Sequence, residues 1–283
     1  MTLDAFQQVL DKMKGHVKLL QLWNQGEPLL NPDLPHMIAY AKERGITVST
    51  STNGHLLADP ECAKALITSG LDHLIVSVDG ATPETYVRYR RGGDLNTVLQ
   101  GIQSVVSTKQ RLRQRTPLIE LQFLVMRHNE HEMDQITEIA QALDVDRLSF
   151  KTVQIDRPDQ VEAFLPSDPR LSRYERIGKR LRVKQRHHLG SRRLRAYSGC
   201  RRLWYSTVVN WDGIVSPCCF DKDAIFVMGN MFEEPFEDIW RGERYRRFRS
   251  VVLRDREALP MCRNCTEGVE KLYVRVLEKT RRE

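Results

Sequence analysis

Residues 20–30 read LQLWNQGEPLL, an apolar run that passes into a Gly-Glu-Pro turn. A continuous apolar run bounded by turn residues is typical of a buried strand in a parallel sheet covered on both faces. Gly26 permits a sharp turn, while Pro28 fixes its own φ and has no N–H to donate. Glu27 is therefore expected at the carboxyl end of a strand, where α/β folds place their ligands. Its carboxylate suits an ammonium group, and a solvated loop glutamate is the alternative.

Two similar turns close the next strand-like runs, and a basic Gly-Gly turn follows them. They are Ser51-Thr52-Asn53-Gly54, Ser77-Val78-Asp79-Gly80 and Tyr89-Arg90-Arg91-Gly92-Gly93. In this order, GEPLL, STNG, SVDG and YRRGG resemble the radical S-adenosylmethionine (SAM) enzymes, specifically those with a C-terminal SPASM-type iron–sulfur extension. The resemblance covers nearly the whole chain and rests on the ordered set, since no single motif is specific.

Composition predicts a soluble globular protein with one large and one small domain. The chain has 283 residues, of which 41% are hydrophobic and 29% charged, and this length can bury a full core. No apolar run reaches the length of a membrane span, so no membrane partner is expected. The first fifteen residues form an amphipathic helical pattern and not a signal peptide, which favours a cytoplasmic location.

The net charge of +7 has a local origin, because Lys and Arg are concentrated in residues 170–202. Such a run can bind nucleic acid or an acidic peptide. A solvated face or a linker is the alternative. The run lacks the interleaved aromatic residues of a single-strand stacking platform, so a nucleic-acid partner is not expected.

Helical and strand patterns alternate through the first half of the chain. Strands are predicted over residues 17–24, 46–51, 74–78, 118–126 and 147–155, each with a helix before it. Asn129 and Glu132 match a capping box for one of these helices. Alternating helices and strands predict a parallel sheet with right-handed crossovers. Five strands are too few for a closed eight-stranded barrel, so the predicted fold is α/β, a partial (open) parallel barrel, which the resemblance also implies.

The resembled family has a strand before the first helix, and the loop after that strand carries the CxxxCxxC motif of its catalytic 4Fe–4S cluster. No CxxxCxxC occurs in this sequence, so no catalytic residue is identified. Loss of an N-terminal segment and degeneration of the site are the two explanations. The resemblance implies SAM and a second 4Fe–4S cluster if that segment is restored.

Three regions are predicted: a radical SAM-like partial barrel without its first strand (1–155), a basic connecting segment with some helix (156–199), and a small SPASM-type iron–sulfur domain (200–283). Cys62 is alone in the first region, whereas the last contains Cys200, Cys218, Cys219, Cys262 and Cys265. Without a secretion signal, clustered cysteines indicate metal ligation rather than disulfides. Trp211-Asp212-Gly213 predicts a hairpin among them.

The expected ligands are Cys200, Cys218, Cys262 and Cys265. By spacing alone, four thiolates suit zinc or a 4Fe–4S cluster equally. The pattern Cys-x12-Gly-x4-Cys is similar to the opening of SPASM domains, which favours an auxiliary 4Fe–4S cluster. Cys219 is an alternative to Cys218, or a small buried hydrophobe. Cys62 is expected to be structural, and Asp221 to support a ligand or to lie on the surface.

The resemblance also implies how SAM is held. By position, Glu27 corresponds to the residue that contacts the SAM ammonium, and Gly26 and Asn53 line the same pocket with Thr52. Ser77 and Asp79 are candidates for the ribose, and Arg90 for the carboxylate, because a guanidinium holds a carboxylate with two hydrogen bonds. The alternatives are a surface charge for Arg90 and a simple turn for Asn53-Gly54.

The functional hypothesis is a radical SAM oxidoreductase-type enzyme that generates a 5′-deoxyadenosyl radical to modify a substrate, with a peptide or protein as the substrate class. An electron donor such as flavodoxin or ferredoxin is the implied partner. The alternative is a non-catalytic 4Fe–4S module of the SPASM type that binds a peptide or partner protein.

Overall fold

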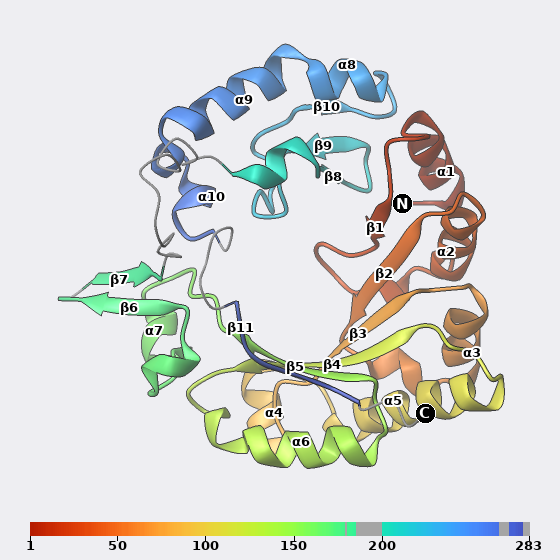
Figure 1. Cartoon of the computed structure of the whole chain (residues 1–283), viewed down its shortest axis with the longest axis vertical. Helices are drawn as coiled ribbons and strands as arrows, with labels where there is room; N and C mark the ends of the chain where they lie inside the picture. The colour runs from red at the N-terminus through yellow and green to blue at the C-terminus, as the bar shows by residue number, and fades with distance from the viewer. Residues whose placement is uncertain (179, 185–199, 266–271, 280–283) are drawn as a thin grey trace. The chain divides into compact units, whose positions relative to one another are not determined.

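The computed structural model describes residues 1–178, 180–184, 200–265 and 272–279 (Figure 1). The chain divides into two compact units. The sheet unit comprises Lys18–Lys184 with Lys271–Glu283, and the cysteine unit comprises Met1–Val17 with Gln185–Glu270. Both units are discontinuous in the sequence, whereas the boundaries predicted from composition are linear.

The sheet unit contains one large sheet, its helices and a short hairpin. Its strands are β1 (Leu19–Gln21), β2 (Thr47–Thr52), β3 (His73–Ser77), β4 (Leu118–Val125), β5 (Arg147–Thr152), β6 (Tyr174–Ile177), β7 (Arg180–Val183) and β11 (Tyr273–Glu278). Its helices are α2 (Leu34–Glu43), α3 (Pro60–Thr68), α4 (Pro83–Tyr89), α5 (Leu95–Arg111), α6 (Met133–Ala142) and α7 (Asp159–Phe164). Short 3₁₀ turns are η1 (Pro28–Leu30), η2 (His55–Ala58), η3 (Glu130–Glu132) and η4 (Pro169–Leu171).

The large sheet has the order β1-β2-β3-β4-β5-β11. The first five strands are parallel, and β11 is antiparallel to β5. Helices α2 to α6 lie along the outer side of this sheet (Figure 1). The five predicted strands and their parallel order are therefore confirmed. The sheet is open in the described part of the chain, and β11 is an addition that the sequence did not predict.

One face of the sheet is apolar and the other is largely polar. On β4, Ile119, Leu121 and Phe123 are at most 1% exposed. The alternating residues Glu120 and Gln122 face the other way, because successive side chains of a strand point to opposite faces. The register places Glu120 beside Arg147 and Gln122 beside Ser149. The inner face thus carries polar groups from neighbouring strands.

Two equivalent clamps hold the amino ends of the strands. Asp72 accepts the backbone N–H of Val48 at 2.7 Å and pairs with Lys42 of α2 at 2.7 Å. Asp146 accepts the N–H of Ile119 at 2.7 Å and pairs with Lys109 of α5, also at 2.7 Å. Each clamp ties a helix to the two strands beside it. This edge of the sheet is therefore organised for stability.

The structure corrects two predictions in this unit and adds a hairpin to a third. The buried strand predicted over 17–24 is the three-residue β1, whose Leu19 is 59% exposed, because β1 has a neighbour on one side only. The predicted capping box does not form, since Asn129 makes no side-chain cap bond. The segment from 156 contains α7 and the β6–β7 hairpin, while residues 185–199 lie outside the described part.

The cysteine unit combines the N-terminal helix with the cysteine-rich region. Its elements are α1 (Leu3–Lys12), η6 (Arg201–Trp204), β8 (Val208–Val209), β9 (Ile214–Ser216), β10 (Gly229–Asn230), α8 (Phe236–Arg241), α9 (Glu243–Arg254), η7 (Arg256–Ala258) and α10 (Pro260–Arg263). The predicted hairpin is the antiparallel pair β8–β9, with Gly213 at φ +81° in its turn. Val9 of α1 packs in one apolar cluster with Cys200, Tyr245 and Phe248.

Candidate functional site

Glu27 is held in place by three donors at the carboxyl edge of the sheet, meaning the loops that follow β1 to β4. Its Oε1 accepts the hydroxyl of Thr52 at 2.6 Å and the N–H of Leu29 at 3.1 Å. Its Oε2 accepts the N–H of Asn53 at 2.7 Å. A carboxylate offers about four acceptor positions, so one position on Oε2 is left for a further donor. Glu27 is a half-buried, oriented carboxylate and not a solvated loop residue.

Glycines allow the close approach of these loops. Gly26 has φ +79°, a left-handed conformation that other residues rarely adopt. Gly54 has φ +87°, and a Cβ there would lie 2.8 Å from Val76 and 2.9 Å from Val98. The STNG turn therefore packs tightly against β3 and α5. This packing fixes the loop that donates to Glu27.

Asp79 and Arg90 form a second anchored pair at the same edge. Asp79 is 1% exposed, accepts the N–H of Leu124 at 2.8 Å and accepts Arg90 Nε at 2.6 Å. Burial alone would lower the pKa of Arg90, but the charge of Asp79 and its hydrogen bond outweigh burial and raise that pKa. Both oxygens of Asp79 are thus engaged within the protein. The pair leaves the Nη groups of Arg90 for a further acceptor, since they bond no other described residue.

The structure joins some of the expected SAM residues by hydrogen bonds, in two separate groups. Glu27, Thr52 and Asn53 are joined by hydrogen bonds, and Asp79 is joined to Arg90. Ser77 is the last residue of β3 and pairs in register with Gln122 on the polar face. The ribose roles expected for Ser77 and Asp79 stay predictions.

Two buried residues hold the loop after β3, and the sequence had assigned them to a capping box. Asn129 is fully buried and donates to the carbonyls of Asp79 at 2.9 Å and Leu124 at 3.0 Å. Glu132 accepts the N–H of Ala81 at 2.9 Å and the hydroxyl of Thr85 at 2.8 Å. The Asn-x-x-Glu spacing was the signal for these residues, but all of their named partners except Leu124 lie about fifty positions away in sequence.

In the cysteine unit, four thiols line one cavity, here called the thiol cavity. Its wall consists of Cys200, Cys218, Cys262 and Cys265 together with Leu203, Phe220, Phe248, Arg256 and Met261. The ligand set predicted from spacing is therefore assembled around one space. Cys219 is not part of this wall, which favours Cys218 as the fourth ligand.

Local turns bring these thiols to the cavity. The Cys265 N–H donates to the carbonyl of Cys262 at 3.3 Å, which closes the Cys-x-x-Cys turn. The Asp221 N–H donates to the carbonyl of Cys218, and the Asp221 carboxylate accepts the N–H groups of Ile225 and Phe226, both at 2.9 Å. Asp221 is 4% exposed. The expectation of a surface aspartate is wrong, because this side chain is buried and organises the loop after Cys218.

The thiols act on one another electrostatically. Burial and then the charge of Cys265 raise the pKa of Cys262 to about 11. The hydrogen bond with Cys219 and burial raise the pKa of Cys218. Burial lowers the pKa of Arg256, but the charges of Cys265, Cys200 and Cys262 outweigh it and raise that pKa. Thiolates that crowd one another favour a cationic occupant, and soft sulfur ligands favour zinc or iron–sulfur clusters. The residues present therefore fit a metal group.

No three His, Cys, Asp or Glu side chains of the described residues are gathered closely enough for a single metal ion. The four thiols instead surround a space. In a 4Fe–4S cluster, four cysteine thiolates hold the cluster as a whole. Cys62 lies on α3 of the sheet unit, and burial followed by the charges of Asp59 and Glu27 raises its pKa.

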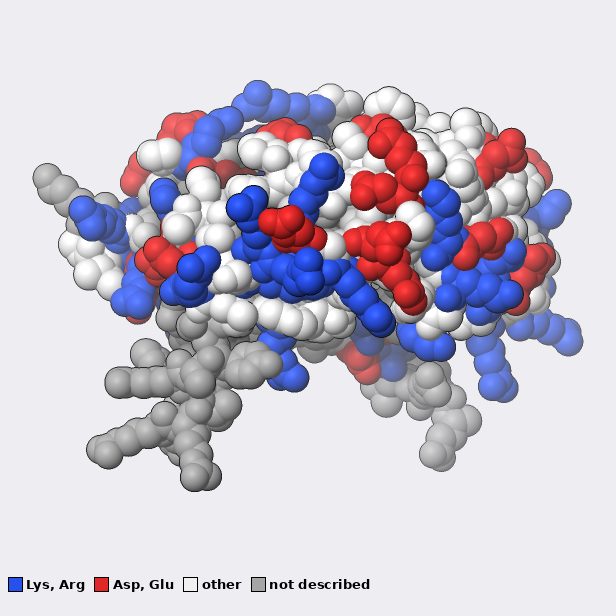
Figure 2. Space-filling view, turned by 90° about the horizontal axis from the view of Figure 1, so that it is seen from above, with Lys and Arg blue, Asp and Glu red and all other residues white. Residues whose placement is uncertain are grey.

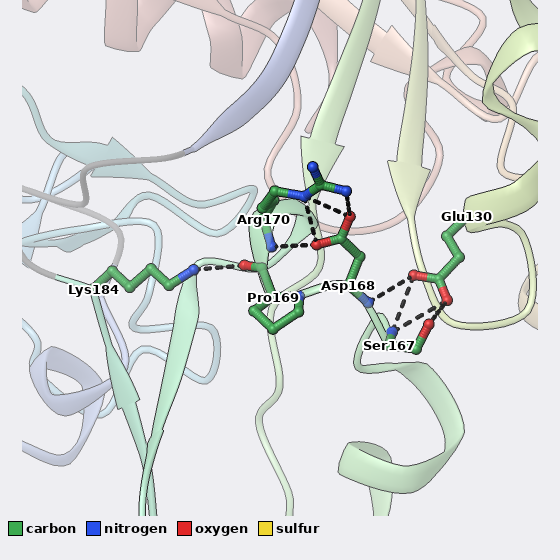
Figure 3. A network of polar contacts seen from close by, with 6 residues as sticks. All are labelled: Glu130, Ser167, Asp168, Pro169, Arg170 and Lys184. Carbon is green, nitrogen blue, oxygen red and sulfur yellow. Dashed lines mark hydrogen bonds and ion pairs between the residues drawn. The ribbon is translucent and has the colours of Figure 1, made fainter.

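Much of the basic stretch that the structure describes is paired within the protein. Arg170 bonds Asp168 at 2.8 Å, and Arg173 is 2% exposed and bonds Thr152. Figure 3 shows how this loop is held: Glu130 accepts the hydroxyl and N–H of Ser167, and Lys184 donates to Pro169 at 2.6 Å. In the face shown in Figure 2, blue basic and red acidic side chains lie among one another. The absence of a nucleic-acid partner stays a prediction.

None of the helices formed by the described residues has the length and apolar character that crossing a bilayer requires.

Comparison with known proteins gives two domain matches. Residues 1–111 match the Radical SAM superfamily, and residues 200–266 match SPASM, described as an iron–sulfur cluster-binding domain. The radical SAM domain uses SAM and a 4Fe–4S cluster, and the SPASM domain binds iron–sulfur clusters.

Individual relatives agree with these matches. The chain is 25% identical over 289 aligned residues to the tungsten-containing aldehyde ferredoxin oxidoreductase cofactor-modifying protein of Pyrococcus furiosus, covering 94% of this chain and 79% of that protein. It is 30% identical over 179 residues to the AdoMet-dependent heme synthase of Methanosarcina barkeri, covering 62% of this chain and 48% of that protein.

Among solved structures, Streptococcus suis SuiB bound to S-adenosylmethionine superposes with a TM-score of 0.61 at 14% identity, covering 87% of this chain and 60% of SuiB. SuiB bound to the precursor peptide SuiA gives a TM-score of 0.59 at 13% identity, with the same coverage. At this identity the likeness concerns the fold alone. The two domain matches show that the chain contains a radical SAM domain over residues 1–111 and a SPASM iron–sulfur cluster-binding domain over residues 200–266.

Proposed function

We propose that the chain acts as a radical SAM enzyme on a peptide or protein, with an auxiliary 4Fe–4S cluster bound by Cys200, Cys218, Cys262 and Cys265. The observation that carries this proposal is the assembly of these four thiols around one cavity. Cys200 lies 62 positions before Cys262 in the sequence. Chance would not bring cysteines from three separate segments to one wall. The match of residues 200–266 to an iron–sulfur domain supports the same ligand set.

The carboxyl edge of the sheet supports SAM as the second ligand. Glu27 retains an acceptor position on Oε2 that suits the SAM ammonium, and Arg90 retains Nη donors that suit its carboxylate. Both charged groups are already oriented by backbone and side-chain bonds. A ligand therefore gains binding energy without ordering these side chains.

Within the proposed reaction, the residues of this chain bind and orient. Glu27 and Arg90 hold the amino-acid end of SAM, while the apolar wall formed by Leu203, Phe248 and Met261 keeps water away from the cluster thiolates. The electron for reductive cleavage of SAM would come from a second 4Fe–4S cluster with an open iron, whose CxxxCxxC ligands this sequence does not contain. Flavodoxin or ferredoxin is the class of donor that we expect to deliver this electron.

The peptide or protein substrate is inferred from a fold likeness. SuiB, which has been captured with a precursor peptide, shares the fold over 87% of this chain. The substrate class is independent of the SAM and cluster assignments. It can be wrong while those assignments are correct.

Anaerobic reconstitution with iron and sulfide tests the metal site. We expect about four irons per chain, followed by saturable binding of SAM in a calorimetric titration. Tight zinc binding without iron uptake would reject the cluster. Iron uptake without any heat of SAM binding would reject the SAM site alone.

A second candidate is a SPASM-type module that binds a peptide without catalysis. The cysteine content favours it, because residues 1–111 contain one cysteine, Cys62, and a CxxxCxxC motif needs three. Only the enzyme would form 5′-deoxyadenosine, and this product distinguishes the two candidates. Formation of 5′-deoxyadenosine above a boiled control would reject the module, whereas tight peptide binding with no such product would support it.

A further inference from the structure

The two charges expected to hold the amino-acid end of SAM stand on different loops. Glu27 precedes η1 and is bonded to Asn53 of the STNG turn. Arg90 follows α4, in the YRRGG turn. An amino acid carries its ammonium and its carboxylate on one carbon, so the distance between their two partners has to be set by the protein. A connection between the two turns is therefore required.

His55 provides that connection. Its Nδ1 lies 3.1 Å from Asn53 Oδ1, and its Nε2 lies 2.9 Å from the backbone N of Asp94. An amide N–H can only donate, so Nε2 is an acceptor and carries no proton. The proton is then on Nδ1, which donates to Asn53 Oδ1. His55 is a neutral imidazole with one hydrogen bond to each turn.

Each end of this connection leads to one of the two charges. The Asn53 N–H donates to Glu27 Oε2 at 2.7 Å, which joins His55 to the carboxylate through one residue. On the other side, the residue before Asp94 is Gly93, whose N–H donates to the carbonyl of Arg90 at 2.9 Å. A Cβ on Gly93 would lie 3.2 Å from His55 Cε1. The YRRGG turn therefore lies directly against the imidazole ring.

We propose that His55 is a positioning residue for SAM, which sets the distance between the Glu27 carboxylate and the Arg90 guanidinium. The inference rests on the proposed function, in which those two groups hold the ammonium and the carboxylate. It assigns to His55 a role in ligand geometry without direct contact with the ligand. Small displacements of aligned groups are costly, and an error of about 1 Å can lower a rate about a hundredfold.

The geometry also predicts which part of the ligand His55 affects. The adenosine part of SAM carries neither the ammonium nor the carboxylate, so its binding does not depend on the distance between Glu27 and Arg90. Loss of His55 should therefore weaken SAM and leave 5′-methylthioadenosine, which lacks the amino-acid end, almost unaffected. A general loosening of the fold would weaken both ligands together.

The test is calorimetric titration of the full chain with SAM and with 5′-methylthioadenosine. For His55→Leu we expect SAM to bind about tenfold to a hundredfold more weakly, with 5′-methylthioadenosine within about twofold. His55→Gln keeps an acceptor and a donor and should restore most of the SAM affinity. His36→Leu, on the exposed side of α2, is the matched control and should change neither affinity.

Several outcomes would overturn the inference. Equal weakening of both ligands in His55→Leu would make His55 a structural residue only, and unchanged affinities would remove its role. Equal losses in the Gln and Leu variants would contradict the hydrogen-bonding argument. Failure of the unaltered chain to bind SAM would reject the proposed function and this inference with it, which is a different result from all the others.

A measurement on the unaltered protein keeps the inference testable where a variant does not fold. Nitrogen chemical shifts of the imidazole distinguish its two neutral tautomers. We expect a protonated Nδ1 and an unprotonated Nε2 for His55. A proton on Nε2 would rule out the bond from Asp94 and overturn the proposal.

Discussion

The carboxyl edge of the sheet and the thiol cavity are both expected to bind charged cofactors, but the chain prepares them differently. At the sheet edge, Glu27 and Asp79 accept backbone N–H groups and oriented side chains. In the thiol cavity, the thiols crowd one another, and the pKa of Cys262 rises to about 11. The first site is stabilised by the protein, whereas the second is expected to be stabilised by a bound metal group. Removing metal should therefore lower the stability of the cysteine unit far more than removing SAM lowers the stability of the sheet unit.

The largest effect is expected from removing two cavity thiols. Replacing Cys262 and Cys265 by serine takes away half of a four-thiolate ligand set, and serine is a poor ligand for iron–sulfur clusters. Iron content after anaerobic reconstitution should fall from about four per chain to near zero. Cys62→Ser is the matched control and should keep full iron. Retention of iron by the double variant would place the cluster elsewhere.

The next effect concerns Glu27. Glu27→Ala removes a charge-assisted bond to the SAM ammonium, which should cost about 1.5–3 kcal/mol, or roughly tenfold to a hundredfold in affinity. Titration with SAM measures the change, and thermal unfolding checks that the fold persists. Glu61→Ala, a largely exposed position on α3, is the control and should stay within about 0.5 kcal/mol. An unchanged Kd in Glu27→Ala would leave Glu27 a purely structural role.

A smaller effect should show that a buried acid of the sheet unit is stabilised by its partners. Burial would raise the pKa of Glu120, but hydrogen bonds from His73 and Ser149 and the charges of His73 and Arg147 outweigh it and lower that pKa. A depressed pKa in the folded state contributes stability above the unfolded value, about 4.3, and this stability is lost as pH falls through the folded value.

Glu120→Gln should therefore lower the free energy of unfolding at pH 7 by about 1–2 kcal/mol. The difference from the unaltered protein should shrink below about pH 4. Urea midpoints at both pH values measure it, with Glu138→Gln on the exposed side of α6 as control. A difference independent of pH would mean that the charge of Glu120 makes no contribution.

The smallest effect separates two adjacent cysteines. Cys218 belongs to the cavity wall and Cys219 does not. Cys219→Ser should therefore keep about four irons per chain, while Cys218→Ser should lose the cluster. The two variants differ by one position and serve as controls for each other. The reverse result would exchange the ligand assignment.

Sequence patterns predicted the sheet well where periodicity was strong. All five parallel strands lie within a few residues of their predicted positions, because long apolar runs and Gly-terminated helices mark them clearly. The edge position of β1 and the added strand β11 were not predictable. Both depend on which strands become neighbours, and no local pattern encodes that choice.

Site residues divide in the same way. Glu27 and the four cavity cysteines were predicted from motif, spacing and resemblance, since their chemistry is visible in the residue type, and their ligand roles stay predictions. His55 was not predicted, and Asn129 and Glu132 were assigned to a capping box, because hydrogen-bond partners such as Asp94, Asp79 and Ala81 lie far from them in sequence. A polar residue reveals its role only when its hydrogen-bond partner is known.

The sequence by itself determined the α/β class, the order of the strands along the chain, the ordered motifs and the set of candidate thiols. These features depend on local periodicity, turn chemistry and side-chain type. Tertiary structure alone decided that Cys218 rather than Cys219 lines the cavity, that Asp79 is committed to Arg90, and that α1 packs with the cysteine-rich region. Each of these depends on contacts between residues far apart in sequence, where packing and hydrogen-bond geometry choose among partners that the sequence leaves equivalent.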